Sequence, residues 1–503
     1  MEKLRKNEIY PQQKDKFDIE LKNPSALSKK IGTIKYLVCS ASVEPVLFLT
    51  MFASVMYQLV VQNLYLEKAC RLEIRYNRSV CDAMTSRNIY GYTQQQETEV
   101  QKLVSQMVAL RSVIQGSFPL IVVIFAGSWS DRHNRRKPLI LIPIIGEILC
   151  CTLLILNSIF FYELPLISTT LGDSLPFALL GGWPCMYSGV FSYIGSKYKG
   201  EENTMRVGII TVTYTSAYLL GSSAGGFLYQ QVGFVLFFII CLTLLIMAFI
   251  MGYFMLKDEC EEIGSSQVEK MSMLRDLFSV KYIEGTFKAA FKSGPNRRRY
   301  KVISVLFVFL FVAGPYFGEL YMNYMYTRLK FSWDAAQFGI FTCVQLIIQV
   351  FGSTISVVFF YRILHWEETF LGIISIMGSI ISNFIFAFAK SGAYLYIGAC
   401  CDLFLPTSGI AIRSFMSKIV PPNELAQANS IIAMVETTLP LIFGPLYTTV
   451  YKYTLSYCPG TYFFVSVILK FLSLNLFIWL YTEAMKDRKR AKRQEVNPVE
   501  ETN

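Results

Sequence analysis

Twelve long apolar runs constrain this 503-residue chain more than any other feature of its sequence. Each run is close to or longer than the roughly 20 apolar residues that a helix needs to cross a bilayer. Inside a bilayer the backbone must satisfy its own hydrogen bonds, so runs of this length predict helices. The predicted spans are 36–64, 105–127, 139–161, 174–195, 207–230, 234–256, 302–325, 338–360, 369–389, 393–415, 428–450 and 461–482. The expected fold class is therefore an all-α membrane protein with twelve transmembrane helices.

The composition agrees with this interpretation and argues against several other classes of protein. Charged residues make up 17% of the chain, where soluble domains carry about 25%, so neither a soluble enzyme nor a disordered chain is expected. The net charge of +11 suits cytoplasmic loops, which collect Lys and Arg, and we expect no nucleic-acid partner. The sequence has no phosphate-binding loop of an ATP-driven pump. With only two histidines, His133 and His365, we expect no metal, no cofactor and no enzymatic reaction.

A charged segment near the middle of the chain separates six spans from six spans, which is the layout of two pseudo-symmetric six-helix halves. The expected parts are a tail at 1–35, a first half at 36–256, a linker at 257–301, a second half at 302–483 and a tail at 484–503. Lys and Arg gather in both tails, in the linker and after the second span, so both termini are expected in the cytoplasm. Apolar residues recur at helical spacing over 273–291, which favours an amphipathic surface helix, with a partner-binding helix as the alternative.

The loop after the first span is expected on the outer side. It holds the Asn77-Arg78-Ser79 sequon, so Asn77 is expected to be glycosylated. Cys70, Cys81 and Cys458 also fall in outer loops, where a disulfide could persist, and the sequence leaves their pairing open.

A few ionisable side chains lie inside the predicted spans, where each costs at least about 2.5 kcal/mol on insertion scales. A carboxyl group at that depth can exchange protons, and a cation can hold an anionic substrate. The candidates for proton coupling are Glu319, Glu147, Asp402 and Glu436, and those for substrate binding are Arg413, Arg111, Tyr316, Tyr214 and Tyr57. Structural alternatives stay open: Glu319 at the outer mouth, Glu44 and Arg413 at the membrane interface, and Lys470 extended outward to the lipid headgroups.

The loop between the second and third spans carries the most specific motif, over residues 127–137. It resembles the G-x-x-x-D-R-x-G-R-R/K loop of the major facilitator superfamily, with Asn134 where that family usually has Gly. Gly127 would let helices approach closely, and Asp131 would cap a neighbouring helix in one access state only. The predicted gating residues are Gly127, Asp131, Arg132, Arg135 and Arg136. A basic loop that only fixes the topology is the alternative.

Three further motifs give a closer resemblance. Ser42-Val-Glu44-Pro45 opens the first span, Trp333-Asp334 follows the seventh, and residues 413–424 close the tenth. With the 127–132 motif, these resemble the proton-coupled folate transporter family of solute carriers, in an invertebrate-type member. The resemblance covers most of residues 40–482. It implies the major facilitator fold and proton-driven uptake of bulky organic anions such as folates, muropeptides or cyclic dinucleotides.

The sequence departs from that family at two positions. Thr211 stands where the folate carrier has a glutamate, and Tyr316 stands where it has a histidine, whereas the arginine of the tenth span is kept as Arg413. Neither Thr211 nor Tyr316 exchanges protons near pH 7, so another carboxyl group must supply coupling. Glu319 is our first choice, because it lies nearly one helical turn from Tyr316 and is expected on the same face.

The predicted function is therefore a secondary active transporter of organic anions that works with protons by alternating access. An exporter of amphiphilic drugs or metabolites on the same fold is one alternative, and a non-transporting membrane receptor or scaffold is another. The expected partners are a small organic anion, protons and the lipid bilayer. We expect a monomer in the plasma membrane, with an endolysosomal membrane as the alternative.

Glycosylation of Asn77 tests the predicted topology. Treatment with a glycosidase should increase the electrophoretic mobility of the wild-type protein and leave Asn77→Gln unchanged, because the sequon is expected on the outer side. A wild-type protein that does not shift would contradict an outer, glycosylated loop.

Overall fold

The computed structural model describes residues 43–133, 135–198, 201–257, 297–364, 366–420 and 425–496. These residues form helices and connecting turns, and no strand occurs among them. Nine of their helical segments are long and apolar enough to cross a membrane. The all-α membrane fold class is confirmed. The tail at 1–35 and residues 258–296 of the linker, with the helix expected over 273–291, lie outside these residues. The helix of the last span continues into the predicted tail at 484–503 as far as Val496.

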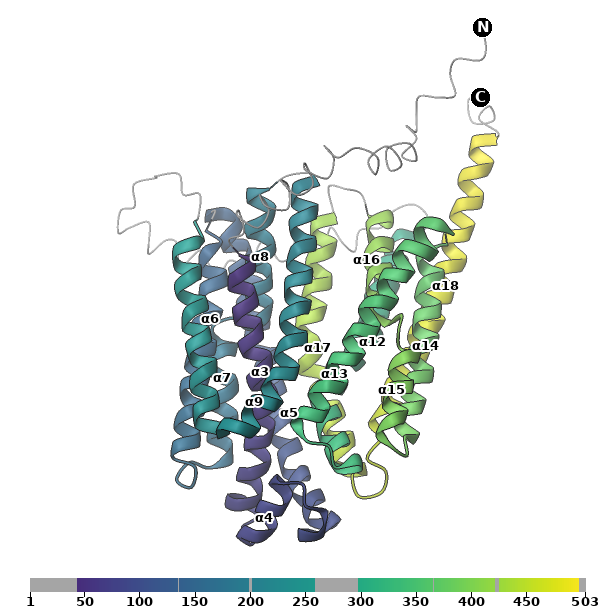
Figure 1. Cartoon of the computed structure of the whole chain (residues 1–503). Coiled ribbons are helices and arrows are strands. Elements are labelled where there is room, and N and C mark those ends of the chain that lie inside the picture. The colour runs from purple at the N-terminus through teal and green to yellow at the C-terminus, as the bar shows by residue number, and fades with distance from the viewer. Residues whose placement is uncertain are drawn as a thin grey trace, which may run out of the picture.

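The helices form two bundles that stand side by side (Figure 1). The first bundle comprises α3 (Glu44–Lys68), η1 (Ala69–Glu73), α4 (Arg78–Thr85), η2 (Ile89–Gly91), α5 (Gln94–His133), α6 (Lys137–Ile159), α7 (Leu166–Leu179), α8 (Gly182–Lys197) and α9 (Glu201–Met255). The second comprises α12 (Arg298–Phe331), α13 (Ala335–Ile355), η4 (Ser356–Ile363), α14 (Glu368–Phe388), α15 (Gly392–Cys401), α16 (Leu405–Ile419), α17 (Leu425–Thr454) and α18 (Tyr462–Val496). Below they are called the first and the second bundle.

Helix α9 contains two crossings joined without a loop. Gly233 has a φ of 72°, a left-handed conformation that glycine adopts readily, and it divides the helix. Before this corner, a Cβ on Gly225 would lie 2.6 Å from the Met56 carbonyl oxygen; after it, a Cβ on Gly252 would lie 3.3 Å from Val46. Both arms therefore pack along α3, which is possible only if the chain reverses at Gly233.

The fourth and tenth spans are each built from two shorter helices. Helices α7 and α8 meet at Gly181 and Gly182, both with positive φ, and α15 and α16 are separated by a turn that begins at Asp402. The fourth span begins at Leu166 and not at residue 174 as predicted. That shift moves Asp173 from a loop into a helix.

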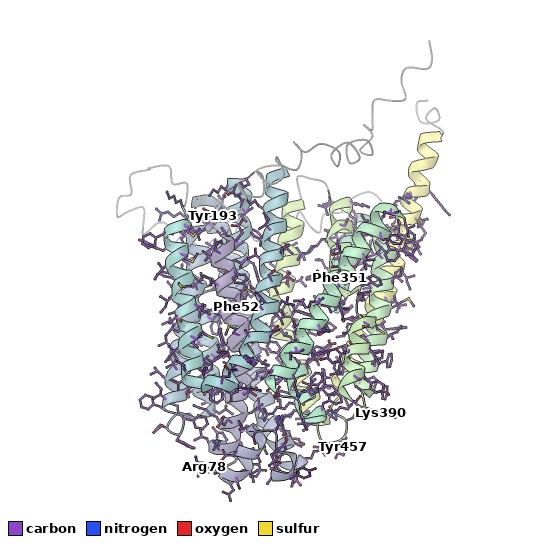
Figure 2. The ribbon with its side chains drawn as sticks, in the orientation of Figure 1. Phe52, Arg78, Tyr193, Phe351, Lys390 and Tyr457 are labelled. Carbon is purple, nitrogen blue, oxygen red and sulfur yellow. A yellow bond between two sulfur atoms is a disulfide. The ribbon has the colours of Figure 1, made fainter. Side chains whose placement is uncertain are left out.

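The two ends of the molecule differ. Arg78, Lys390 and Tyr457 lie toward one end and Tyr193 toward the other (Figure 2); these are called the α4 end and the Glu44 end. Asn77 is exposed at the α4 end, directly before α4. A disulfide joins Cys70 to Cys81, whereas Cys458 is a free, exposed thiol. The pairing that the sequence left open is therefore Cys70 with Cys81.

The two bundles touch through small residues on α5, α9 and their neighbours. A Cβ on Gly116 of α5 would lie 2.7 Å from the Cβ of Leu441 on α17, and one on Gly226 of α9 would lie 2.6 Å from the Ala335 carbonyl oxygen of α13. Such close approach needs glycine, as in other membrane helix pairs.

Candidate functional site

A cluster inside the first bundle contains one buried cation, Arg111, and two buried carboxyl groups. Arg111 of α5 forms an ion pair with the Asp173 carboxylate of α7, with 2.5 Å between Nε and Oδ2. Tyr65 donates a hydrogen bond of 3.1 Å to the same carboxylate. Glu147 of α6 is fully buried and accepts a hydrogen bond from Ser54, while its Oε1 has no partner among the described residues. The charge of Arg111 is thus balanced by Asp173, and Glu147 has no cation of its own.

A cluster inside the second bundle also contains one cation and two carboxyl groups. Lys470 of α18 is 3% exposed; it donates a 2.7 Å hydrogen bond to Ser379 and lies 3.9 Å from Glu319 of α12. Asp402 is buried close to Lys470 and accepts a hydrogen bond of 3.1 Å from Gln349. Lys470 therefore does not extend to the lipid headgroups, and that alternative is wrong.

Glu319 points into the second bundle. It accepts hydrogen bonds from Asn383 of α14 at 3.0 Å and from Ser466 of α18 at 2.5 Å. Tyr316, in contrast, is 45% exposed and lies near Tyr214 and Tyr218 of the first bundle. The expectation that Glu319 and Tyr316 share a helix face is therefore wrong, because a three-residue step rotates the helix by about 300° and leaves the side chains about 60° apart.

An accessible ion pair faces the first bundle from the second. Arg413 of α16 and Glu436 of α17 are 3.4 Å apart, and their side chains are 57% and 45% exposed. Glu436 lies near the hydroxyl groups of Tyr187 and Tyr214. Because the two charges are both accessible and only loosely paired, either can bind another ion.

A row of aromatic rings in the first bundle lies beside this ion pair. Trp183 and Tyr187 of α8 have ring centroids 5.9 Å apart, and Tyr187 contacts Tyr214 of α9 edge-on at 5.8 Å. Tyr214 is 6.4 Å from Tyr218. Together with Tyr316, these rings supply flat apolar surface with hydroxyl groups near Glu436, the partner of Arg413.

Polar contacts join the bundles at the α4 end. Arg328 of α12 donates hydrogen bonds to Glu97 at 3.1 Å, Asn63 at 3.2 Å and the Met84 carbonyl at 3.1 Å, all in the first bundle. Other bonds between the bundles link Tyr324 to Asn63, Tyr451 to Gln101 and Gln230 to Asp334. Asp334 also caps α13 by accepting from the Gln337 amide. These contacts, called the seal below, hold the bundles together at this end.

The predicted site residues thus fall into three groups. Arg111, Glu147 and Tyr57 are buried in the first bundle, Glu319 and Asp402 lie in the second, and Arg413, Glu436, Tyr214 and Tyr316 surround the accessible ion pair. Thr211 is exposed on α9. Glu44, for which a place at the membrane interface was left open, is buried and pairs with Arg206 at 2.9 Å.

The predicted gating loop is described only in part. Arg135 is exposed and Arg136 is half-buried. The structure does not describe Asn134, the surroundings of Gly127, or the side chains of Asp131 and Arg132. The gating role therefore stays a prediction.

Sequence reasoning missed several residues of these groups. Asp173 was missed because the fourth span was started too late. Glu97 and Arg328 lie just beyond the predicted spans, on helices that continue past the width of a bilayer. The rings of Trp183 and Tyr187 gave a signal, since they stand four residues apart and share a helix face.

Known proteins resemble this chain along most of its length. Residues 46–445 match the Major Facilitator Superfamily profile. The probable peptidoglycan muropeptide transporter SLC46 of Drosophila melanogaster is 22% identical, covering 83% of this chain and 81% of the relative. The lysosomal proton-coupled steroid conjugate and bile acid symporter SLC46A3 of Gallus gallus is 24% identical, with coverage of 87% and 93%. The crystal structure of the human organic anion transporter MFSD10 has a TM-score of 0.56 at 14% identity, covering 87% and 98%. The resemblance to the folate transporter family of solute carriers is confirmed.

Removal of the Asp173 charge should destabilise the protein strongly. Asp173→Asn leaves Arg111 buried without its counter-ion, which costs about 3–5 kcal/mol. Thermal unfolding of the purified protein measures the effect. The matched control is Asp82→Asn, which removes an exposed partner of Arg71 and should cost about 0–1 kcal/mol. Equal losses in the two variants would contradict a buried ion pair.

Proposed function

Because this chain belongs to the Major Facilitator Superfamily, we propose that it carries bulky organic anions together with protons across its membrane by alternating access. The chain is a multi-pass membrane transporter and not an enzyme. What it carries, which residues hold the cargo, and how protons take part are inferences from the geometry of the two bundles.

The seal indicates which side of the membrane the transporter is closed to in this structure. Positive residues gather in the segments that adjoin the Glu44 end, so we place that end in the cytoplasm and the α4 end, with Asn77, outside. The seal then closes the outer side, and the accessible Arg413 and Glu436 are reached from the cytoplasm. Transport requires a second state in which the seal is broken. In the gating loop, Asp131 and Arg132 would stabilise one of the two states on the cytoplasmic side.

One observation carries the choice of substrate class: the exposed Arg413 guanidinium pairs with Glu436, and Glu436 lies near two rings of an aromatic row, Tyr187 and Tyr214. A guanidinium binds carboxylates and related anions, and aromatic rings bind the apolar body of a bulky molecule. The relatives carry substrates of this description, namely muropeptides, and steroid conjugates and bile acids. In this proposal Glu436 competes with the substrate for Arg413, which keeps binding reversible.

Proton coupling follows from the charge count. Each of the two clusters, around Arg111 and around Lys470, holds one cation and two carboxyl groups, and an uncompensated charge at membrane depth costs roughly 2.5–3.5 kcal/mol. We therefore expect one carboxyl group of one of these clusters to take up the transported proton. Glu319 remains our first choice, because its side chain is 13% exposed and only loosely paired with Lys470, whereas Glu147 is fully buried. We place the protein in the plasma membrane, with an endolysosomal membrane as the alternative.

Substitution of Arg413 tests the substrate site. Uptake of a labelled muropeptide by cells expressing Arg413→Gln should fall by about tenfold or more in kcat/KM, the effect of losing one charge-assisted hydrogen bond. Arg413→Lys should retain part of the activity. The control is Lys390→Gln, an exposed cation near the α4 end whose removal should leave uptake unchanged. Normal uptake by well-expressed Arg413→Gln would refute the binding role.

Substitution of Glu319 tests the proton pathway. Wild-type uptake should be faster in acidic outer medium, because protons then enter together with the substrate. Glu319→Gln mimics the permanently protonated form and should flatten this pH dependence while the substrate still binds. Glu147→Gln, measured in parallel, should keep the wild-type profile. If wild-type uptake is independent of pH, the protein is a facilitator or an exchanger and proton coupling is wrong.

A further inference from the structure

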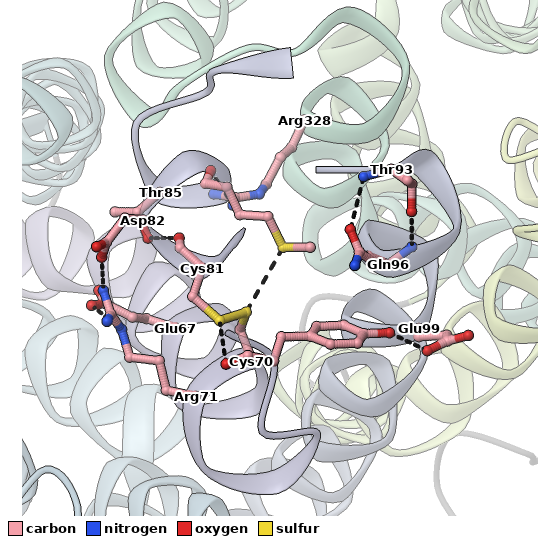
Figure 3. The surroundings of a disulfide bond; sticks show 12 residues. Glu67, Cys70, Arg71, Cys81, Asp82, Thr85, Thr93, Gln96, Glu99 and Arg328 are labelled. Atoms are coloured by element: carbon pink, nitrogen blue, oxygen red, sulfur yellow. Dashed lines mark hydrogen bonds and ion pairs between the residues drawn. A yellow bond between two sulfur atoms is a disulfide. The ribbon is translucent and has the colours of Figure 1, made fainter. Parts of the chain in front are cut away.

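A polar pocket lies within the seal, between the two bundles at the α4 end. Its walls come from α3, α4, α5 and α9 of the first bundle and from α12 and α13 of the second. The lining residues used below are Arg87, Glu97, Val100, Tyr229, Tyr324 and Arg328. The Cys70–Cys81 disulfide is also part of the wall, and Figure 3 shows it with Arg328. This pocket is separate from the accessible ion pair of Arg413 and Glu436.

Two guanidinium groups of the pocket lining, Arg87 and Arg328, share one carboxylate, Glu97. Glu97 accepts hydrogen bonds from both Arg328 at 3.1 Å and Arg87 at 3.1 Å, so one carboxylate serves two guanidinium groups. The remaining carboxylates of the lining have their own partners: Glu67 pairs with Arg71, and Asp334 caps α13. The Nε donor of Arg87 finds no acceptor in the part of the chain that the structure describes. The Arg87 guanidinium can therefore donate to one further acceptor.

We propose that this pocket is an entry site for the substrate, in which a carboxylate of the organic anion replaces Glu97 between Arg87 and Arg328. The proposal rests on the proposed function, because it assigns a second binding step to the same anion. Replacement of one carboxylate by another keeps both guanidinium groups paired, which a buried site requires. The rings of Tyr229 and Tyr324 line the same pocket and would contact the apolar part of the anion.

Binding there also explains how the outer side opens. Arg328 belongs to the second bundle, whereas Glu97, Asn63 and Met84 belong to the first. Once an anion has taken the place of Glu97, the direct bond from Arg328 to the first bundle is replaced by contacts through an anion that is covalently attached to neither bundle. The substrate therefore weakens the seal that it has to pass, and its binding free energy drives the change of state.

The disulfide fixes the first-bundle side of this site. Cys81 lies on α4, and its bond to Cys70 holds that helix against the end of α3. The Arg71–Asp82 ion pair, at 2.6 Å, fixes α4 a second time (Figure 3). Met84 and Arg87 follow on the same segment, so the carbonyl and the guanidinium that face the pocket are held in place before an anion binds.

The anion site can be tested without transport. In a background with Cys400→Ser and Cys458→Ser, which removes both exposed thiols of the described residues, Val100→Cys places a reporter thiol in the pocket wall. A membrane-impermeant thiol reagent is added to intact cells with sodium benzoate or with uncharged benzamide. Benzoate should slow labelling and benzamide should not, and Arg87→Gln should abolish the protection. Equal effects of benzoate and benzamide, or no effect of either, would overturn the anion site.

Uptake kinetics separate an entry site from a simple seal. Arg87→Gln should raise KM for a muropeptide by about tenfold, with the maximal rate little changed, and Arg87→Lys should restore part of the loss. Glu97→Gln removes the internal competitor and should lower KM. Both variants break the same ion pair, so a purely structural seal predicts shifts in the same direction, which would refute the proposal. If the wild type takes up no muropeptide, the proposed cargo is wrong, and protection by benzoate still decides the anion site.

Discussion

The cost of placing a charge inside a membrane governs this structure more than any other term. The buried cations Arg111, Arg206 and Lys470 each pair with a carboxylate from another helix, so each of these ion pairs fixes the relative position of two helices. Arg111 and Asp173 hold α5 to α7, and Arg206 and Glu44 hold α9 to the start of α3. The apolar faces, which contact lipid as readily as one another, give no comparable preference for one arrangement. The polar residues therefore specify the helix packing that hydrophobicity leaves open.

The cost of a charge inside the membrane also bears on where the ion pairs of this structure lie. Within each bundle, buried ion pairs join helices that move together. Between the bundles, the Arg328–Glu97 pair of the seal lies where it can separate, whereas Arg413 and Glu436, both in the second bundle, are loosely paired on the accessible surface. A carrier needs both kinds, because rigid bodies must persist while the contacts between them change.

The number of spans and the fold class followed from the sequence, because apolar runs long enough to cross a bilayer have few other solutions. The residues of the candidate site were predicted less completely from the sequence. The fourth span contains Gly181, Gly182 and Pro184, which weaken the apolar signal, so its start was misplaced and Asp173 was lost as the partner of Arg111. Arg328 and Glu97 lie on helical turns outside the apolar runs, where hydropathy carries no information.

The direction in which a side chain points was the second feature that the sequence did not predict. The separation of Tyr316 and Glu319 by three residues predicted a shared face, yet a rotation of about 60° is enough to place one toward the first bundle and the other among α14 and α18. The sequence cannot supply this angle, since it depends on how the helix is rotated against its neighbours. For the same reason the Cys70–Cys81 pairing required the structure.

The corner at Gly233 has a mechanical consequence. A loop between two crossings absorbs relative sliding, but a single glycine between two continuous helices leaves no slack. The arms of α9, each packed along α3, therefore form a stiff unit of three crossings within the first bundle. Helix α13 contacts this unit at Gly226, about two helical turns before Gly233. A small displacement of α13 at the sealed end would therefore move both arms of α9 together.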